Sequence, residues 1–142
     1  ISGGVFLILL LTACALPRIV ILNDPLTAQE HNDLGVVYEQ KGMYDLAEKE
    51  YRQAVAKEKG WAVPWFNRGN LAYRRGNLSE AEKMYRKALA LNRENPDIMN
   101  KLAQVVIDLG RREEAKSLIE RALAIQAKPE YLDTARRLNT QP

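Results

Sequence analysis

From residue 28 onward, apolar and small residues recur at the spacing of amphipathic helices. One helical face, spaced i, i+3, i+4 and i+7, consists of His31, Leu34, Gly35 and Tyr38. A second face, slightly further along the chain, consists of Ala47, Tyr51 and Ala54. Extended along the chain, the pattern predicts six helices, over residues 28–41, 45–58, 62–75, 79–92, 96–109 and 113–126.

The same pattern repeats every 34 residues. Four columns keep this spacing through three cycles: Gly42, Gly76 and Gly110; Ala47, Ala81 and Ala115; Tyr51, Tyr85 and Ile119; and Ala54, Ala88 and Ala122. Gly35 and Gly69 form a fifth column, with Ala103 in the third cycle. The glycines of the first column are expected to end the first helix of each pair, because glycine enters the left-handed conformation without a steric penalty. The chain is therefore predicted to contain three copies of one helix pair.

Polar residues before the helices indicate where several of them begin. Asn95 is an expected N-cap, with Pro96 in the first helical position. Capping boxes are indicated for Thr27 with Glu30 and Ser79 with Glu82, and a related motif for Asp45 with Glu48.

Residues 130–139 form a seventh predicted helix, shorter than the others. We expect four apolar residues to cover the last helix pair, namely Tyr131, Leu132, Ala135 and Leu138. Arg136 and Arg137 are expected to face water. A terminal cap with a polar outer face is what a repeat array needs for solubility. A partner-docking helix is the alternative interpretation.

The second cycle, "WFNRGNLAYRRGNLSEAEKMYRKALALN", resembles the tetratricopeptide repeat (TPR). Cycle one departs from that family pattern at His31, and cycle three at Met99, Ala103 and Ile119. The resemblance covers residues 28–129 as three repeats, 28–61, 62–95 and 96–129, with a capping helix and tail over 130–142. It implies an all-α fold, a right-handed α-solenoid of three helix-turn-helix repeats closed by a C-terminal capping helix.

The resemblance also implies a concave groove lined by the first helix of each pair, where partner segments bind. Phe66 and Tyr73 are expected to act as aromatic anchors, and Asn32, Asn70 and Asn100 to hydrogen-bond an extended segment. The alternative is that these side chains only pack against one another. No basic clamp for a C-terminal carboxylate is evident. The expected groove residues are Asn32, Val36, Val63, Phe66, Asn70, Tyr73, Arg74, Asn100, Gln104 and Ile107.

The apolar run at residues 5–11 leads to the single cysteine, Cys14. Leu11-Thr12-Ala13-Cys14 resembles the lipobox of bacterial lipoproteins. This resemblance implies a signal peptide over residues 1–13, truncated at its start, and a lipid on the Cys14 thiol. Residues 14–27 would then be a lipidated tether, whose apolar run at 19–22 is expected to be covered by the first helix pair or to pair with a partner as a strand. The alternatives are a retained membrane anchor and an ordinary buried cysteine.

Composition and charge narrow the function. The chain carries 21 Lys and Arg against 18 Asp and Glu, a balance too even to indicate nucleic acid as a partner. His31, the only histidine, is interpreted as a packing residue between the helices. The sequence contains no recognisable catalytic constellation, metal-ligand set, phosphate loop or cofactor motif, so we expect neither a cofactor nor an enzyme.

The function expected from these observations is a membrane-tethered adaptor in the bacterial cell envelope that binds a segment of another envelope protein. The lipid would place it at the periplasmic face of the outer membrane or at the cell surface. One alternative is a structural, self-associating subunit of an envelope assembly such as a pilus, secretion or export complex. A second is an accessory that presents substrates to a separate peptidase or cell-wall hydrolase.

Overall fold

A computed structural model describes residues 24–140, so the expectations for Cys14 and for residues 1–23 lie outside the described residues. The described part contains seven helices. They are α1 (Ala28–Gln40), α2 (Tyr44–Lys57), α3 (Ala62–Arg74), α4 (Leu78–Leu91), α5 (Pro96–Asp108), α6 (Arg112–Ile125) and α7 (Pro129–Thr140). The all-α fold and the order of the predicted helices are confirmed, and each predicted boundary lies within one residue of the observed one.

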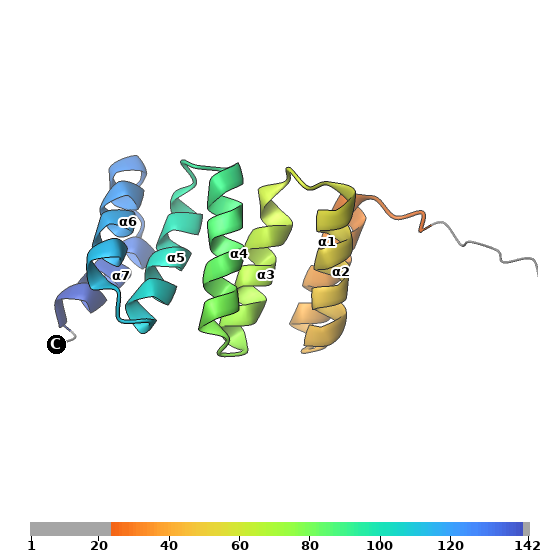
Figure 1. Ribbon diagram of the computed structural model, residues 1–142, viewed down its shortest axis with the longest axis horizontal. Helices are drawn as coiled ribbons and strands as arrows, with labels where there is room; N and C mark the ends of the chain where they lie inside the picture. The colour runs from red at the N-terminus through yellow and green to blue at the C-terminus, as the bar shows by residue number, and fades with distance from the viewer. Residues whose placement is uncertain (1–23, 141–142) are drawn as a thin grey trace, which may run out of the picture.

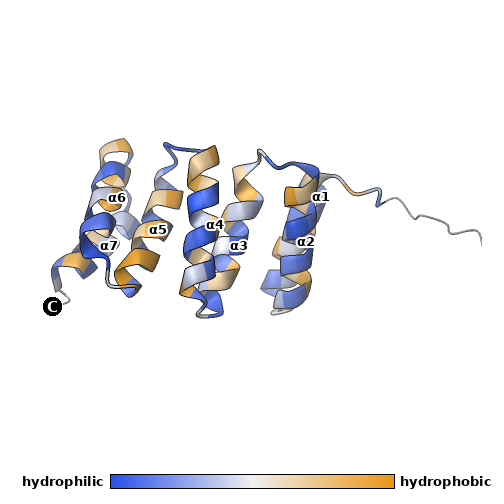
Figure 2. Cartoon of the chain, in the orientation of Figure 1, coloured by the Kyte–Doolittle hydropathy of each residue, from blue (hydrophilic) through white to orange (hydrophobic). Residues whose placement is uncertain are grey.

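The helices form pairs that stand side by side in a row, α1–α2, α3–α4 and α5–α6, with α7 against the last pair (Figure 1). Helices within a pair make the most extensive contacts, and each pair contacts the next through α2 with α3 and α4 with α5. The apolar colouring is most continuous along α5, which has helices on both sides (Figure 2). Among helices within residues 24–140, none combines the length and the apolarity needed to cross a membrane.

Each hairpin turn depends on a glycine in the left-handed region. Gly42, Gly76 and Gly110 have φ values of 73°, 74° and 80°, and no other described residue has a positive φ. In the first turn the N–H of Met43 donates to the carbonyl of Tyr38 over 2.9 Å, which closes the backbone after the helix. The predicted role of these three glycines is confirmed.

The predicted helix starts are confirmed at two places and corrected at two others. Thr27 forms its capping box with Glu30, and the Asn95 side chain accepts a hydrogen bond from the N–H of Ile98. Helix α4, however, begins at Leu78, and its N-cap is Asn77, whose side chain accepts from the N–H of Glu80. Asn77 follows the turn glycine directly and immediately precedes the helix, where its side chain can accept from the free N–H groups of the first turn. Ser79 already lies inside that turn.

The other correction concerns the start of α2. Asp45 lies inside the first turn of this helix, and the N-cap is Met43, which makes no side-chain capping bond. An acidic side chain in the first turn still stabilises the helix through its dipole.

Close approach of the two helices within a pair depends on Gly35 and Gly69. A Cβ atom added at Gly35 would lie 2.5 Å from the ring of Tyr51, and one added at Gly69 would lie 2.6 Å from the ring of Tyr85. Both rings are almost completely buried. In the third pair the same two columns hold Ala103 and the smaller Ile119, and both residues are buried.

The apolar core is divided unevenly along the row. A large cluster runs from α3 and α4 through α5 and α6 to α7, and includes Leu102, Val106 and Ile119. The other cluster, the first-pair cluster, is much smaller and consists of Ala47 and Tyr51 of α2 with Leu71 of α3, and three partly buried side chains pack against it.

His31 does more than fill space between helices, which corrects its interpretation as a packing residue. It is 3% exposed, with Nδ1 2.7 Å from Glu50 Oε2 on α2 and Nε2 2.6 Å from Asp24 Oδ2 in the segment before α1. Each ring nitrogen thus faces a carboxylate oxygen that can accept a hydrogen bond from it. The main-chain N–H of Leu26, and then His31, lower the pKa of Asp24. His31 therefore attaches the entering chain to both helices of the first pair.

The last helix covers the array as predicted, with two differences. Tyr131 and Leu138 are buried, but Leu132 is 43% exposed. Arg137 does not simply face water, because its guanidinium donates to Asp108 over 2.7 Å. This bond ties the end of α5 to α7.

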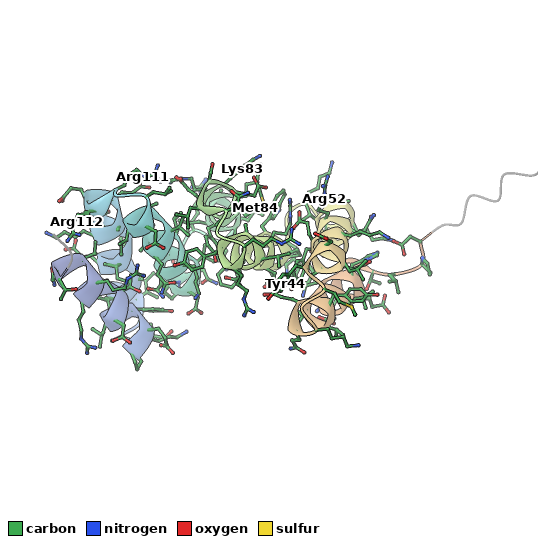
Figure 3. All side chains as sticks on the ribbon, turned by 90° about the horizontal axis from the view of Figure 1, so that it is seen from below. Tyr44, Arg52, Lys83, Met84, Arg111 and Arg112 are labelled. Atoms are coloured by element: carbon green, nitrogen blue, oxygen red, sulfur yellow. The ribbon has the colours of Figure 1, made fainter. Side chains whose placement is uncertain are left out.

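Ion pairs between the second helices of neighbouring pairs make the stability of the fold depend on pH. Glu82 accepts hydrogen bonds from Arg86 on its own helix and from Arg111 at the start of α6, a residue labelled in Figure 3. Burial raises the pKa of Glu82, but the bonds from Arg111 and Arg86 outweigh it, so the pKa is lowered overall.

A carboxyl group with a lowered pKa stabilises the fold above its unfolded pKa of about 4.3, and this stabilisation is lost as the pH falls through the folded value. We therefore expect the free energy of unfolding in urea to decrease between neutral pH and pH ~3. In Glu82→Gln this decrease should be smaller than in the wild type. An identical pH profile for the two proteins would contradict a contribution from Glu82.

Candidate functional site

Two neighbouring hollows open beside α5. The first, the α3–α5 pocket, has a volume of about 310 Å³ and lies between the start of α3 and the turn that leads into α5. Its lining includes Val63, Phe66, Asn67, Asn95, Asp97 and Ile98.

The second hollow, the α5–α7 pocket, also has a volume of about 310 Å³ and lies between α5 and the start of α7. Its lining consists of Phe66, Asp97, Asn100, Lys101, Gln104, Lys128, Glu130 and Tyr131. Phe66 and Asp97 line both hollows. We call the two hollows together the double pocket.

Phe66 is held in place from behind. It is half-buried, and its ring packs against the ring of Tyr85 at 5.7 Å between centroids with a tilt of 51°. The Tyr85 hydroxyl donates to Asn70 Oδ1 over 2.7 Å, and burial raises the pKa of Tyr85, so the hydroxyl keeps its proton. Phe66 is thus a fixed aromatic surface between the two hollows, which is the usual character of a binding hot spot.

Polar pairs connect the first helices of successive repeats. Asn67 donates to Asn32 over 2.8 Å, and the Tyr73 hydroxyl donates to Asp108 over 2.7 Å. Arg74 pairs with Glu39 at 3.4 Å. Each pair joins residues 35 positions apart, and Glu39–Arg74 and Tyr73–Asp108 occupy the same columns of successive repeats. These bonds set the spacing of α1, α3 and α5 on the side of the expected groove.

Asp97 stands where the two hollows meet. Its carboxylate accepts hydrogen bonds from Lys128 over 2.8 Å and from the Tyr131 hydroxyl. Burial raises the pKa of Asp97, but the bonds from Lys128 and Tyr131 outweigh it and lower the pKa overall. An ionised carboxylate is therefore a fixed part of the double pocket at neutral pH.

Asn100 lies in the wall of the α5–α7 pocket with an incomplete set of hydrogen bonds. The residue is 3% exposed, and its Oδ1 atom has no hydrogen-bond partner among the described residues. Leaving a buried acceptor unpaired costs about 1–3 kcal/mol. The neighbouring Gln104 differs, because its amide donates to Thr134 of α7 over 3.1 Å.

The expected groove residues thus fall into three groups. Four of them, Val63, Phe66, Asn100 and Gln104, come together around the double pocket. Four others, Asn32, Asn70, Tyr73 and Arg74, have hydrogen-bond or ion-pair partners on neighbouring helices. The remaining two pack in the interior, Val36 half-buried against the first-pair cluster and Ile107 only 5% exposed.

Helix α7 and the residues before it supply part of the lining that the expected groove did not include. Lys128, Glu130 and Tyr131 belong to the segment interpreted as a cap, and Asn67 lies beside the expected position on α3. The signal for Tyr131 was its place on the apolar face of the seventh helix, which indicated contact with the last repeat. Within residues 24–140, no three His, Cys, Asp or Glu side chains are placed to hold a metal ion.

Helix pairs that repeat every 34 residues, stack in a row and end in a covering helix define an α-solenoid of helical repeats. Two family models, both described as tetratricopeptide repeat, match residues 31–56 and 72–138. The chain is a tetratricopeptide-repeat protein.

Solved TPR domains share the whole arrangement. The first TPR of Spaghetti (RPAP3), bound to the HSP90 peptide SRMEEVD, has a TM-score of 0.76 and 26% identity, with 84% of this chain and 95% of that chain covered. The first TPR domain of human RPAP3 has a TM-score of 0.74 and 26% identity, with 79% and 89% covered.

Curated proteins show the repeat inside much larger chains. Cilia- and flagella-associated protein 70 of Homo sapiens is 33% identical over 99 residues, 70% of this chain. The TPR repeat-containing thioredoxin TTL4 of Arabidopsis thaliana is 38% identical over 71 residues, 49% of this chain. This chain spans about a tenth of the length of the curated relatives it matches.

Proposed function

We propose that this protein is a non-enzymatic adaptor that binds an extended segment of a partner protein in the double pocket. The observation that carries the proposal is Phe66, an aromatic side chain fixed by Tyr85 and shared by both hollows. The TPR domain of Spaghetti supports it, because a domain with the same arrangement of helices binds a short peptide. The hydrogen bonds between α1, α3 and α5 support it further, since they keep the binding surface preformed.

The test uses a photo-reactive amino acid, p-benzoylphenylalanine, placed at one position at a time in cells that make the protein. At Val63, which is 42% exposed in the α3–α5 pocket, irradiation should give a discrete adduct with a partner protein. At Lys83 of α4, whose side chain is 64% exposed away from the pocket, no such adduct should form. Adding Phe66→Ala should remove the Val63 adduct. The same adducts at both positions, or none at Val63, would contradict the proposal.

The adaptor is further proposed to act at a membrane of the bacterial cell envelope, through a lipid on Cys14. The support is the tetrapeptide Leu11-Thr12-Ala13-Cys14 after the apolar run at residues 5–11. Two acyl chains on one residue give stable anchoring, since each buried methylene contributes about 0.8 kcal/mol. The protein should incorporate labelled fatty acid and sediment with membranes, and Cys14→Ala should lose both properties. A Cys14→Ala protein that stays with membranes would indicate a retained anchor instead.

A further inference from the structure

We infer that the double pocket selects an uncharged, internal stretch of extended chain and pairs one of its main-chain amides with the side-chain amide of Asn100. The inference rests on the proposed binding function and names the class of segment. It excludes acidic peptides such as SRMEEVD, the peptide bound to the TPR of Spaghetti, and it excludes segments recognised through a free C-terminus.

The first step concerns the hydrogen bonding of Asn100. Its Oδ1 atom is a buried acceptor without a partner, although the residue forms part of the pocket wall. Rotation about χ2 exchanges the two ends of an asparagine amide and is soft, so either end can turn to the pocket. A main-chain peptide unit offers one donor and one acceptor, which match the two ends of the asparagine amide. A bound segment would therefore satisfy a group that the free protein leaves unpaired.

The second step concerns the uncharged character of the lining. Helix α3 contributes Ala62, Val63, Phe66 and Asn67 to the double pocket, none of which is charged. The turn into α5 adds Asn92 and Asn95. Amide and apolar side chains of this kind suit a main chain with apolar side chains, and none of them carries a positive charge to pair with a carboxylate group of a ligand.

The third step concerns the charges that are present. The α5–α7 pocket holds two acidic and two basic side chains, Asp97, Glu130, Lys101 and Lys128, which balance one another. Lys128 is already bonded to Asp97. Asp97 lines both hollows, so a segment that crosses from one to the other meets the Asp97–Lys128 ion pair and not an uncompensated positive charge. A pocket whose charges balance offers no net attraction to Asp and Glu, which disfavours acidic segments relative to uncharged ones.

The experiment sorts two phage-displayed libraries of random heptapeptides on the wild-type protein. One library presents the peptides with a free C-terminus, and the other presents them between constant flanking sequences. We expect enrichment from the flanked library, in sequences poor in Asp and Glu. Recovery that depends on a free C-terminus, or sequences rich in Asp and Glu, would overturn the inference.

Asn100→Leu separates ligand binding from a structural role. Leucine has nearly the shape of asparagine and removes the unpaired acceptor, so the Tm of the free variant should equal or exceed that of the wild type. Its affinity for an enriched flanked peptide should fall by about tenfold or more. Gln53→Leu, an equivalent change on the exposed side of α2, should leave that affinity unchanged. A lower Tm with unchanged affinity would show that Asn100 only supports the fold.

The two proposals fail in different ways. If acidic or C-terminal peptides are enriched and Phe66→Ala abolishes their binding, the adaptor function stands and the inferred segment class falls. If neither library yields peptides that are enriched more strongly on the wild type than on the Phe66→Ala variant, the proposed binding function is wrong, and this inference is wrong with it.

Discussion

His31→Met is expected to lower the free energy of unfolding by about 3 kcal/mol, because it leaves the side chain of Glu50 buried without its hydrogen-bond partner. The Glu50 side chain is 11% exposed, and its carboxylate lies 2.7 Å from the imidazole that would be lost. Asp24 would also lose its attachment to α1. Urea unfolding at neutral pH, followed by far-UV circular dichroism, measures the loss. A variant as stable as the wild type would show that the histidine contributes only volume.

The chain itself offers the matched control. The third pair carries Met99 and Leu118 in the columns of His31 and Glu50, and these apolar side chains are 1% and 6% exposed. Replacing both partners of a buried hydrogen bond by apolar residues of similar shape can be nearly neutral. The double variant His31→Met/Glu50→Leu should therefore recover most of the stability that His31→Met loses. Losses that simply add would contradict a coupled pair.

Gly69→Ala is expected to cost about 1–3 kcal/mol, because the added methyl group has no room. Its position lies 2.6 Å from the Tyr85 ring, which is 1% exposed and hydrogen-bonded to Asn70. The ring cannot move without disturbing Phe66, against which it packs. Thermal and urea unfolding report the cost. Gly60→Ala is the control, since an added Cβ there has no neighbour within 4 Å.

A second substitution tests whether the clash is the cause. The third pair holds buried Ala103 and Ile119 in the columns of Gly69 and Tyr85. The double variant Gly69→Ala/Tyr85→Ile should therefore be more stable than the sum of the two single losses indicates. If the stability losses of the two single variants simply add in the double variant, the cost of Gly69→Ala comes from the backbone and not from the contact with the Tyr85 ring.

The helices were predictable because their signals are local. A period of 3.6 within each helix and 34 between repeats fixes both the type and the order of the elements. The turn at Gly42 was predictable as well, because a glycine at the end of a helix can adopt the left-handed conformation that ends it. The start of α4 was harder to place, because Asn77 and Ser79 are both good caps and only the turn geometry chooses between them.

The contacts between distant residues were not predictable in the same way. Nothing in the spacing of Asp24, His31 and Glu50 indicates that the three side chains meet, because the first lies outside the repeats. The double pocket was found only in part, since Phe66 and Asn100 follow the repeat pattern whereas Lys128 and Tyr131 come from the covering helix. The lipid on Cys14 lies outside the described residues and stays a prediction.

The uneven core has a mechanical consequence. The first helix pair holds the small apolar cluster, whereas the double pocket is built entirely from α3, α5, α7 and the turns between them. Force applied from the N-terminal side enters through the segment that His31 attaches to Asp24, and it reaches the first pair before the others. Under tension, α1 and α2 would separate from α3 as one unit and lengthen the N-terminal part of the chain. The double pocket would stay assembled, because no residue of α1 or α2 lines it. The first repeat would then extend under load before the repeats that hold the ligand.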